Sequence, residues 1–534
     1  MERISAVDRS GAGLARGGGK MTVASAVSRL TGLARTTALT AVLGVGLVGD
    51  AYSAANSLPG MIYQLLLGGV LAAVMLPYLT RQRARGRRLD REQTQRLLTV
   101  AALALAAITL VALACVPLIV GALVSDPEQR RLASLFAYLL LPGIVGYGMT
   151  AVMTSVLNVR AVFAAPAWAP VINNIVLLVS ISVFLLVPGP VTLTPTTMTV
   201  PQILVIGVGT LLGVVSQAAA VALALHRTGF RWKLRVRVIP HTWRPIRAGA
   251  PILGWVIVYV VAGQIGIVVA MKAALAREGF AAYLQADLLF QVAYGVLGVS
   301  LLTVLMPRIA QSISVGDVRA VISDLGRGAR YSVVTLIPVT VALMVLAPSL
   351  TTVIFIGQVD VASARQIGTA LALSAFGLVP FAMVMLQLRV FYAGNDTRTP
   401  AVINGVMVTV KIAVIVVAAH SLGGDAFFVT LCSAGSVSFV VGAVLGHVLL
   451  RKRYGLLGFH HVGETLGRIV AASVPAGGLA LAVVLGIDGA VHQPRIAAVA
   501  ALVAGTVAGG ALLLWGCSLV GVPEVRRARV LLRP

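Results

Sequence analysis

The chain is dominated by long apolar stretches that alternate with short polar segments along almost its whole length. About 20 apolar residues are needed for a helix to cross the hydrocarbon core of a bilayer. The pattern predicts an all-α polytopic membrane protein with about fourteen spans, the alternative being twelve spans with two misread segments. The predicted spans are residues 23–47, 52–79, 97–124, 132–156, 166–188, 202–225, 247–271, 283–306, 331–355, 367–391, 400–419, 426–449, 469–487 and 496–520.

Lysine and arginine are divided unevenly between the loops that these spans would place on opposite sides of the membrane. Of the 42 Lys and Arg residues, 32 fall on the side of the N-terminus and six on the other side. Cytoplasmic loops carry an excess of positive charge. We therefore expect a multi-pass protein of the cytoplasmic membrane with both termini in the cytoplasm.

Two segments of the first half of the chain resemble segments about 230 residues later. Residues 68–77 resemble residues 298–307, and residues 170–174 resemble residues 400–404. Because six spans separate the copies, the halves would share one orientation and form parallel repeats. This predicts two six-helix bundles around a central cavity, with two extra helices at the C-terminal end.

The predicted organisation has six parts. They are a cytoplasmic N-terminal segment (1–22), an N-lobe (23–226), a basic cytoplasmic linker (227–246), a C-lobe (247–450), two further spans with a preceding basic loop (451–520), and a cytoplasmic tail (521–534). Membrane proteins with two such bundles are typically transporters that expose a central site to one side and then to the other.

Composition and motifs narrow the function further. The chain is 58% hydrophobic, and its net charge of +25 comes from loop residues that we assign to topology and to contacts with anionic lipids. We therefore expect no nucleic-acid partner. The three cysteines form no metal-binding spacing, and the sequence contains neither a P-loop nor a His-Glu-x-x-His motif. A transporter without cofactor or metal, and not an enzyme, is the expectation.

The charged residues inside or at the ends of apolar spans include Arg29, Arg35, Asp50 and Asp287. A charge at the centre of a membrane helix costs roughly 2.5–3.5 kcal/mol on insertion scales, so such residues usually face a cavity and serve a function. The guanidinium group presents a planar set of donors that suits phosphate oxygens. Arg29 and Arg35 are therefore candidates for binding a diphosphate, and interfacial snorkelling is the alternative for Arg29.

The acidic residues and several polar residues have structural alternatives as well. Asp50 is a candidate for gating, although it could equally cap the following helix. Asp287 is a candidate for gating or ion coupling, and a surface position in a shorter helix is the alternative. Lys411 is expected to face a cavity. Asn174 and Asn404 occupy matching repeat positions, where hydrogen bonds between helices compete with substrate binding as their role.

Several of these residues stand in motifs that resemble one transporter family. The motifs include Ser28-Arg-Leu-Thr-Gly-Leu-Ala-Arg35, Asp50-Ala-Tyr52, Tyr294-Gly-Val-Leu-Gly298 and Asp396-Thr-Arg-Thr-Pro400. They resemble the MviN/MurJ-type lipid II flippases, which belong to the multidrug/oligosaccharidyl-lipid/polysaccharide exporter superfamily. The resemblance runs through twelve spans, the two extra spans also fit it, and the Arg- and Ala-rich composition resembles a high-GC Gram-positive (actinobacterial) source.

The resemblance implies transport of lipid II, a peptidoglycan precursor, from the inner to the outer leaflet by alternating access. It implies that Arg29, Arg35 and Asp50 are needed for transport, that Asp287 is a functional acidic position, and that proteins of cell-wall synthesis or division are possible partners. The chain departs from the family pattern at Tyr63, Gly68, Leu288 and Gln291, where many members carry charged residues. A cation-coupled drug exporter, another lipid-linked saccharide flippase and a non-transporting scaffold of the cell-wall machinery remain alternatives.

Overall fold

The computed structural model of the chain describes residues 2–67, 87–190, 192–233, 250–455 and 460–521, and all regular structure within them is helical. The helices are α1 (Glu2–Leu43), α2 (Leu47–Leu67), α4 (Arg87–Ala114), α5 (Val116–Leu123), α6 (Pro127–Leu140), α7 (Gly143–Val159), α8 (Ala164–Phe184), α9 (Val200–Arg227), α11 (Ala250–Leu275), α12 (Phe280–Ser314), α13 (Val318–Ile354), α14 (Val361–Ser374), η3 (Ala375–Gly377), α15 (Leu378–Ala393), α16 (Arg398–Ser421), α17 (Gly424–Tyr454), α18 (His460–Ala490) and α19 (Pro494–Leu519).

The helices confirm the predicted all-α class of a multi-pass membrane protein. Each predicted span overlaps at least one helix, although the second (52–79) and the seventh (247–271) extend into residues outside the described part of the chain. Within the described residues, 11 helical segments are long and apolar enough to cross a bilayer. The count of fourteen spans therefore stays a prediction.

Three predicted spans are not single helices. The span at 97–124 breaks at Cys115, next to Pro117, and the span at 132–156 breaks at Leu141 and Pro142. The span at 367–391 contains the 3-10 turn η3, and Pro380 stands in the first turn of the helix that follows. Proline lacks a backbone N–H and clashes with the preceding turn, so it favours a break at each of these places.

The chain divides into two compact units, Met1–Val261 and Ala262–Pro534, and the boundary lies within α11. In the first unit, α8 packs against α1 and α9, while α2 packs against α6 and α7. Tyr52 joins three of these helices, because its buried ring meets Phe136 edge-on at 5.3 Å and its hydroxyl lies 2.8 Å from Thr210 Oγ1. Tyr52 therefore links α2, α6 and α9 inside a core of mostly aliphatic side chains.

Each unit contains a close approach between a glycine of one helix and an asparagine of another, and the two asparagines occupy matching repeat positions. In the first unit, a Cβ atom added to Gly32 of α1 would lie 3.5 Å from Asn174 Nδ2 of α8. In the second unit, a Cβ atom added to Gly263 of α11 would lie 4.0 Å from Asn404 Nδ2 of α16. Small residues allow two membrane helices to approach closely. The first helix of each predicted repeat thus meets a later helix through the same pair of residue types.

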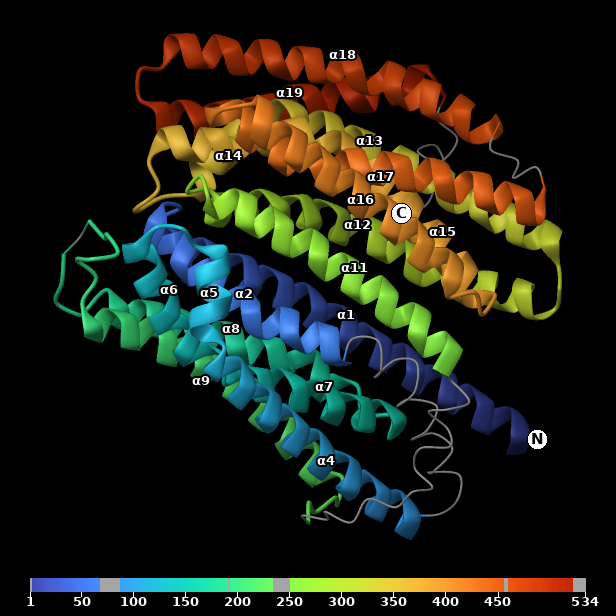
Figure 1. Ribbon diagram of the computed structural model, residues 1–534. Coiled ribbons are helices and arrows are strands. Elements are labelled where there is room, and N and C mark those ends of the chain that lie inside the picture. The colour runs from blue at the N-terminus through green and yellow to red at the C-terminus, as the bar shows by residue number, and fades with distance from the viewer. Residues whose placement is uncertain (1, 68–86, 191, 234–249, 456–459, 522–534) are drawn as a thin grey trace. The chain divides into compact units, whose positions relative to one another are not determined.

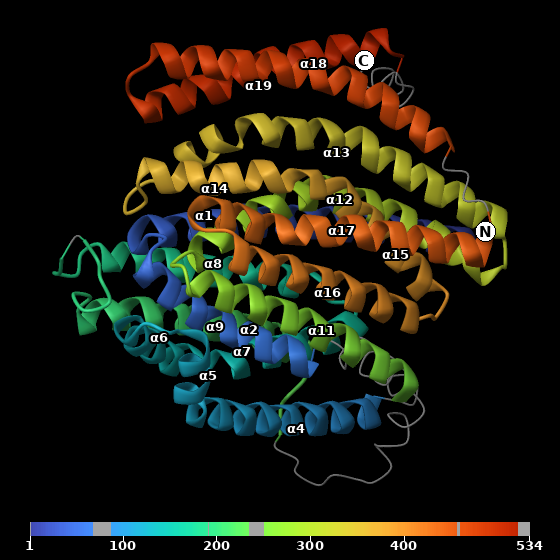
Figure 2. The same ribbon diagram turned by 45° about the horizontal axis from the view of Figure 1, so that its top comes forward.

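In the second unit, α13 contacts α12, α14, α15 and the hairpin formed by α18 and α19. The hairpin lies along α13 in both views (Figure 1, Figure 2). Its two helices are closely packed, since a Cβ atom added to Gly509 would lie 3.1 Å from Ala480 Cβ and 3.2 Å from Ala476 O. Van der Waals packing of small residues is a main source of helix association in a bilayer.

We expect Gly509→Leu to lower the unfolding temperature of the purified chain, because a larger side chain must separate α18 from α19. Overpacking of this kind typically costs about 1–3 kcal/mol. Gly510→Leu is the matched control, since nothing lies within 4 Å of a Cβ atom added there. Equal unfolding temperatures for the two variants would show that the hairpin is not held by this contact.

A polar clasp ties the segment between α15 and α16 to the end of α17. Asp396 accepts hydrogen bonds from the Thr399 backbone N–H at 3.0 Å and the Thr399 hydroxyl at 2.8 Å, and Arg453 Nη1 lies 3.0 Å from its carboxylate. Partial burial acts to raise the pKa of Asp396, but these hydrogen bonds and the Arg453 charge outweigh it and hold the pKa below its ordinary value. The clasp therefore stabilises the fold at neutral pH and is lost only in strong acid.

Candidate functional site

The arginines of the predicted diphosphate site both lie on α1, which is helical without interruption through Gly32. At about 100° per residue, their spacing of six places them on different faces of the helix. The side chain of Arg29 is exposed, whereas that of Arg35 is half-buried. The structure therefore gives the two arginines different surroundings.

Arg35 lies beside two tyrosines of neighbouring helices. Its guanidinium interacts electrostatically with Tyr52 of α2 and Tyr147 of α7. Within the described part of the chain, Arg35 forms no ion pair, and no hydrogen bond of its side chain is present. A half-buried guanidinium without an acceptor retains its hydrogen-bonding capacity for a ligand.

A chain of polar side chains continues from Tyr147 into the first unit. The Tyr147 side chain lies next to Asn173 of α8, and Asn173 Nδ2 donates a hydrogen bond to Gln217 Oε1 of α9 at 3.0 Å. Asn173 is only 6% exposed. We name Arg35, Tyr147, Asn173 and Gln217 the N-lobe polar cluster. Sequence analysis assigned no role to Asn173, Tyr147 or Gln217, because single polar residues in apolar helices do not reveal which helices meet.

Asn174 joins α8 to α1 beside this cluster. Its Nδ2 donates to Ser28 O at 3.2 Å and to Thr31 Oγ1 at 3.0 Å. Both acceptors lie within one or two turns of Arg29 and Arg35. In this structure Asn174 thus makes hydrogen bonds between helices, and through them it fixes the part of α1 that carries both arginines.

Asp50 is fully buried, with an exposed fraction of 0%. Helix α2 begins at Leu47, so Asp50 lies within its first turn and its backbone N–H donates to Gly46 O at 2.8 Å. The alternative that Asp50 caps the helix is therefore wrong, because the helix begins three residues earlier. A carboxylate in the first turn is favoured by the positive end of the helix dipole.

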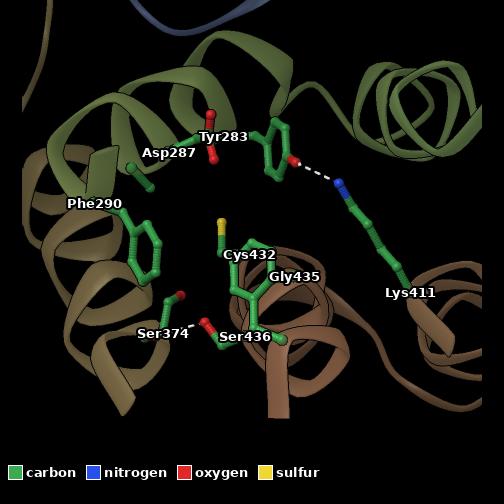
Figure 3. Close-up of a pocket in the computed structure, with 10 residues that line it drawn as sticks. Tyr283, Asp287, Phe290, Ser374, Lys411, Cys432, Gly435 and Ser436 are labelled. Carbon is green, nitrogen blue, oxygen red and sulfur yellow. Dashed lines mark hydrogen bonds between the residues drawn. The ribbon is translucent and has the colours of Figure 1, made fainter. Parts of the chain in front are cut away.

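The second unit contains a small polar pocket of about 60 Å³ (Figure 3). That volume accommodates a few water molecules. The pocket is lined by Tyr283, Ala286, Asp287, Phe290, Ser374, Lys411, Cys432, Gly435, Ser436 and Phe439. These residues come from α12, α14, α16 and α17. Two of the predicted site residues, Asp287 and Lys411, therefore line one pocket.

The two charged groups of this pocket are held by neutral partners. Gln291 Nε2 donates to Asp287 Oδ2 at 2.6 Å, and Lys411 Nζ donates to the Tyr283 hydroxyl at 3.2 Å. Figure 3 shows Lys411 reaching from its own helix to Tyr283. Asp287 and Lys411 also attract each other electrostatically. A half-buried carboxylate and a half-buried ammonium thus compensate each other within the second unit.

The remaining lining residues are the aromatic Phe290 and Phe439 and the small residues Ala286, Ser374, Cys432, Gly435 and Ser436. Ser436 donates a hydrogen bond to Ser374 O at 2.6 Å, which joins α17 to α14. Cys432 lines the pocket as a free thiol. No group of three or more His, Cys, Asp or Glu residues that could hold a metal ion occurs in the described ranges. Asn404 lies outside this pocket, against Gly263 of α11.

Comparison with known proteins places these features in context. A sequence model of the family described as lipid II flippase MurJ matches residues 39–514. The chain is 26% identical over 426 residues to a probable lipid II flippase MurJ of Rhizobium meliloti, covering 77% of this chain and 76% of that protein. It is 26% identical over 449 residues to the lipid II flippase MurJ of Burkholderia cenocepacia, covering 80% and 82%. These relatives give no support to the predicted Gram-positive source.

Solved structures show the same fold. The inward closed conformation of a lipid II flippase MurJ aligns with a TM-score of 0.74 at 18% identity, covering 96% of this chain and 99% of that chain. An inward-facing multidrug transporter of the MATE family aligns with a TM-score of 0.63 at 15% identity, covering 82% and 99%. Arg29 and Arg35 precede the range matched by the family model, so their roles depend on the geometry around them.

Proposed function

This chain belongs to the lipid II flippase MurJ family, and we propose on that basis that it moves lipid II from the inner to the outer leaflet of the cytoplasmic membrane. It is a transporter and not an enzyme. We further propose that both termini lie in the cytoplasm, as the distribution of Lys and Arg indicates. Proteins of cell-wall synthesis or division are proposed partners.

The proposed substrate site rests on one observation, the burial of the Arg35 side chain without an ion-pair partner among the described residues. Its guanidinium is half-buried in a membrane helix and has no ion-pair partner within the described residues. Such a charge is unfavourable unless an anion compensates it. A diphosphate supplies two adjacent groups of acceptor oxygens, which a guanidinium binds through paired hydrogen bonds. We assign Arg35 to diphosphate binding, with Arg29 as a second, more exposed contact.

We assign the acidic residues to conformational change. Asp287 and Lys411 compensate each other inside the second unit, so movement of α12 against α16 would change the energy of both charges. A charge energy that depends on the relative position of two helices is a property expected of a gate in an alternating-access transporter. Asp50, fully buried at the start of α2, is proposed as a second gating residue. The MATE-like fold alone does not favour drug export, and the cationic Arg35 opposes binding of an amphiphilic cation.

The proposal is tested by titrating the purified chain with lipid II and measuring its unfolding temperature. A ligand that binds only the folded state raises that temperature as its concentration passes the dissociation constant. Lipid II is expected to stabilise the chain, and phosphatidylglycerol, an anionic lipid without a diphosphate, is expected to do so much less. Equal stabilisation by both lipids would contradict a diphosphate site.

A further inference from the structure

Two tyrosines form an aromatic surface beside the N-lobe polar cluster. Tyr63 of α2 and Tyr147 of α7 have ring centroids 6.4 Å apart and planes inclined by 31°. Both side chains are half-buried. The rings are therefore close enough to act as one surface, and part of each ring remains accessible.

Tyr147 is fixed in position by its polar neighbours. Its side chain lies next to Asn173, which is hydrogen-bonded to Gln217, and it interacts electrostatically with Arg35. A Cβ atom added to Gly143, one turn earlier in α7, would lie 3.9 Å from the Tyr147 ring. The ring is thus held next to Arg35 before any ligand binds.

Tyr63 contributes a second ring and a free polar group. Its hydroxyl forms no hydrogen bond among the residues that the structure describes. Buried tyrosine hydroxyls usually find a partner. Tyr63 lies against Tyr147, and Tyr147 in turn interacts with Arg35. With a phenol and a guanidinium that have no hydrogen-bond partner among the described residues, this group suits a ligand that carries both an anionic group and neutral hydrogen-bonding groups.

A sugar joined directly to a diphosphate has this combination of groups. The phosphate oxygens accept from a guanidinium, the C–H face of the pyranose ring packs on an aromatic ring, and its hydroxyl or amide groups bond to a phenol. We propose that Tyr63 and Tyr147 bind the first sugar of the substrate while Arg35 binds its diphosphate. This proposal rests on the proposed function and adds a determinant of specificity, namely discrimination between a glycosylated and a bare polyprenyl diphosphate.

The test compares two ligands, lipid II and undecaprenyl diphosphate, by thermal stabilisation of the purified full chain. Tyr63→Ala is expected to weaken lipid II binding about 3- to 10-fold, the range typical of one aromatic contact, while changing undecaprenyl diphosphate binding less than about twofold. Tyr63→Phe, which keeps the ring and loses the hydroxyl, is expected to retain the part of the discrimination that comes from packing on the ring and to lose the part that comes from the hydrogen bond. If Tyr63→Ala does not fold, Tyr63→Leu is used in its place, because leucine keeps an apolar side chain of similar bulk. Tyr63→Leu is also expected to lose the discrimination between lipid II and undecaprenyl diphosphate.

The outcomes distinguish a failure of the sugar-binding proposal from a failure of the proposed diphosphate site. Equal weakening of both ligands by Tyr63→Ala, or no weakening of either, would overturn the sugar-binding role while leaving Arg35-dependent diphosphate binding intact. Absence of any Arg35-dependent binding of either ligand would instead overturn the diphosphate site itself. A selective loss of lipid II affinity, with both ligands still dependent on Arg35, would establish the aromatic pair as the sugar-binding surface.

Discussion

Arg35→Ala is expected to weaken lipid II binding by about 10- to 100-fold, because hydrogen bonds to charged groups contribute about 1.5–3 kcal/mol. The half-buried guanidinium has no carboxylate partner in the described part of the chain, so its removal leaves no buried charge uncompensated. The unliganded fold should therefore keep its stability or gain slightly. Binding is measured by the lipid II dependence of the unfolding temperature.

Two further variants make the Arg35 result specific. Arg131→Ala removes an exposed arginine of α6 and is expected to leave lipid II binding unchanged. Arg35→Lys keeps the charge but loses the planar pair of donors, so an intermediate affinity is expected. Wild-type affinity in Arg35→Ala, in a folded protein, would contradict the assignment of this residue to the diphosphate.

The second large effect is expected at the charge pair of the pocket in the second unit. Asp287→Asn leaves the Lys411 ammonium without its carboxylate, and Lys411→Met leaves the carboxylate without its ammonium. Removing one partner of a fully buried ion pair costs about 3–5 kcal/mol. Asp287 and Lys411 are half-buried and interact at longer range than an ion pair, so the expected loss lies below that range. Each single variant should therefore unfold at a lower temperature.

A double variant distinguishes the effect of the two charges on stability from their effect on transport. Asp287→Asn with Lys411→Met removes both charges, so its loss of stability should be smaller than the sum of the single losses. Transport should stay low in the double variant, because the charges that would gate the movement of α12 and α16 are gone. Strictly additive losses of stability would show that the two groups do not interact. Full transport by the double variant would exclude the pair as a gate.

The fold was predictable because a bilayer imposes a simple rule on the sequence. Each span must be helical and apolar, so the predicted stretches fall on helices. The breaks were not predictable, since proline has different effects at different sites. Pro117 and Pro142 stand at helix boundaries, whereas Pro59 and Pro170 remain inside helices. Packing against neighbouring helices decides whether a helix ends at a proline or continues through it. That packing cannot be read from the sequence alone.

Individual residues of the site could be predicted from the sequence, but their neighbours in space could not. The energetic cost of a charge in hydrocarbon identified Arg35 and Asp287 as candidates. It could not show that Tyr147 of a distant helix would meet Arg35, or that Lys411 would share a pocket with Asp287. The hydrogen bond between Asp287 and Gln291 was accessible from the sequence, because residues four apart share one face of a helix.

The most direct test is lipid II exposure at the outer leaflet of cells depleted of their own flippase and supplied with this chain, either intact or as Arg35→Ala. The intact chain should restore exposure, and the Arg35→Ala variant, at equal abundance in the membrane, should not. Failure of the intact, well-expressed chain to restore exposure would contradict lipid II transport. Restoration by both forms would contradict the role of Arg35 in that transport.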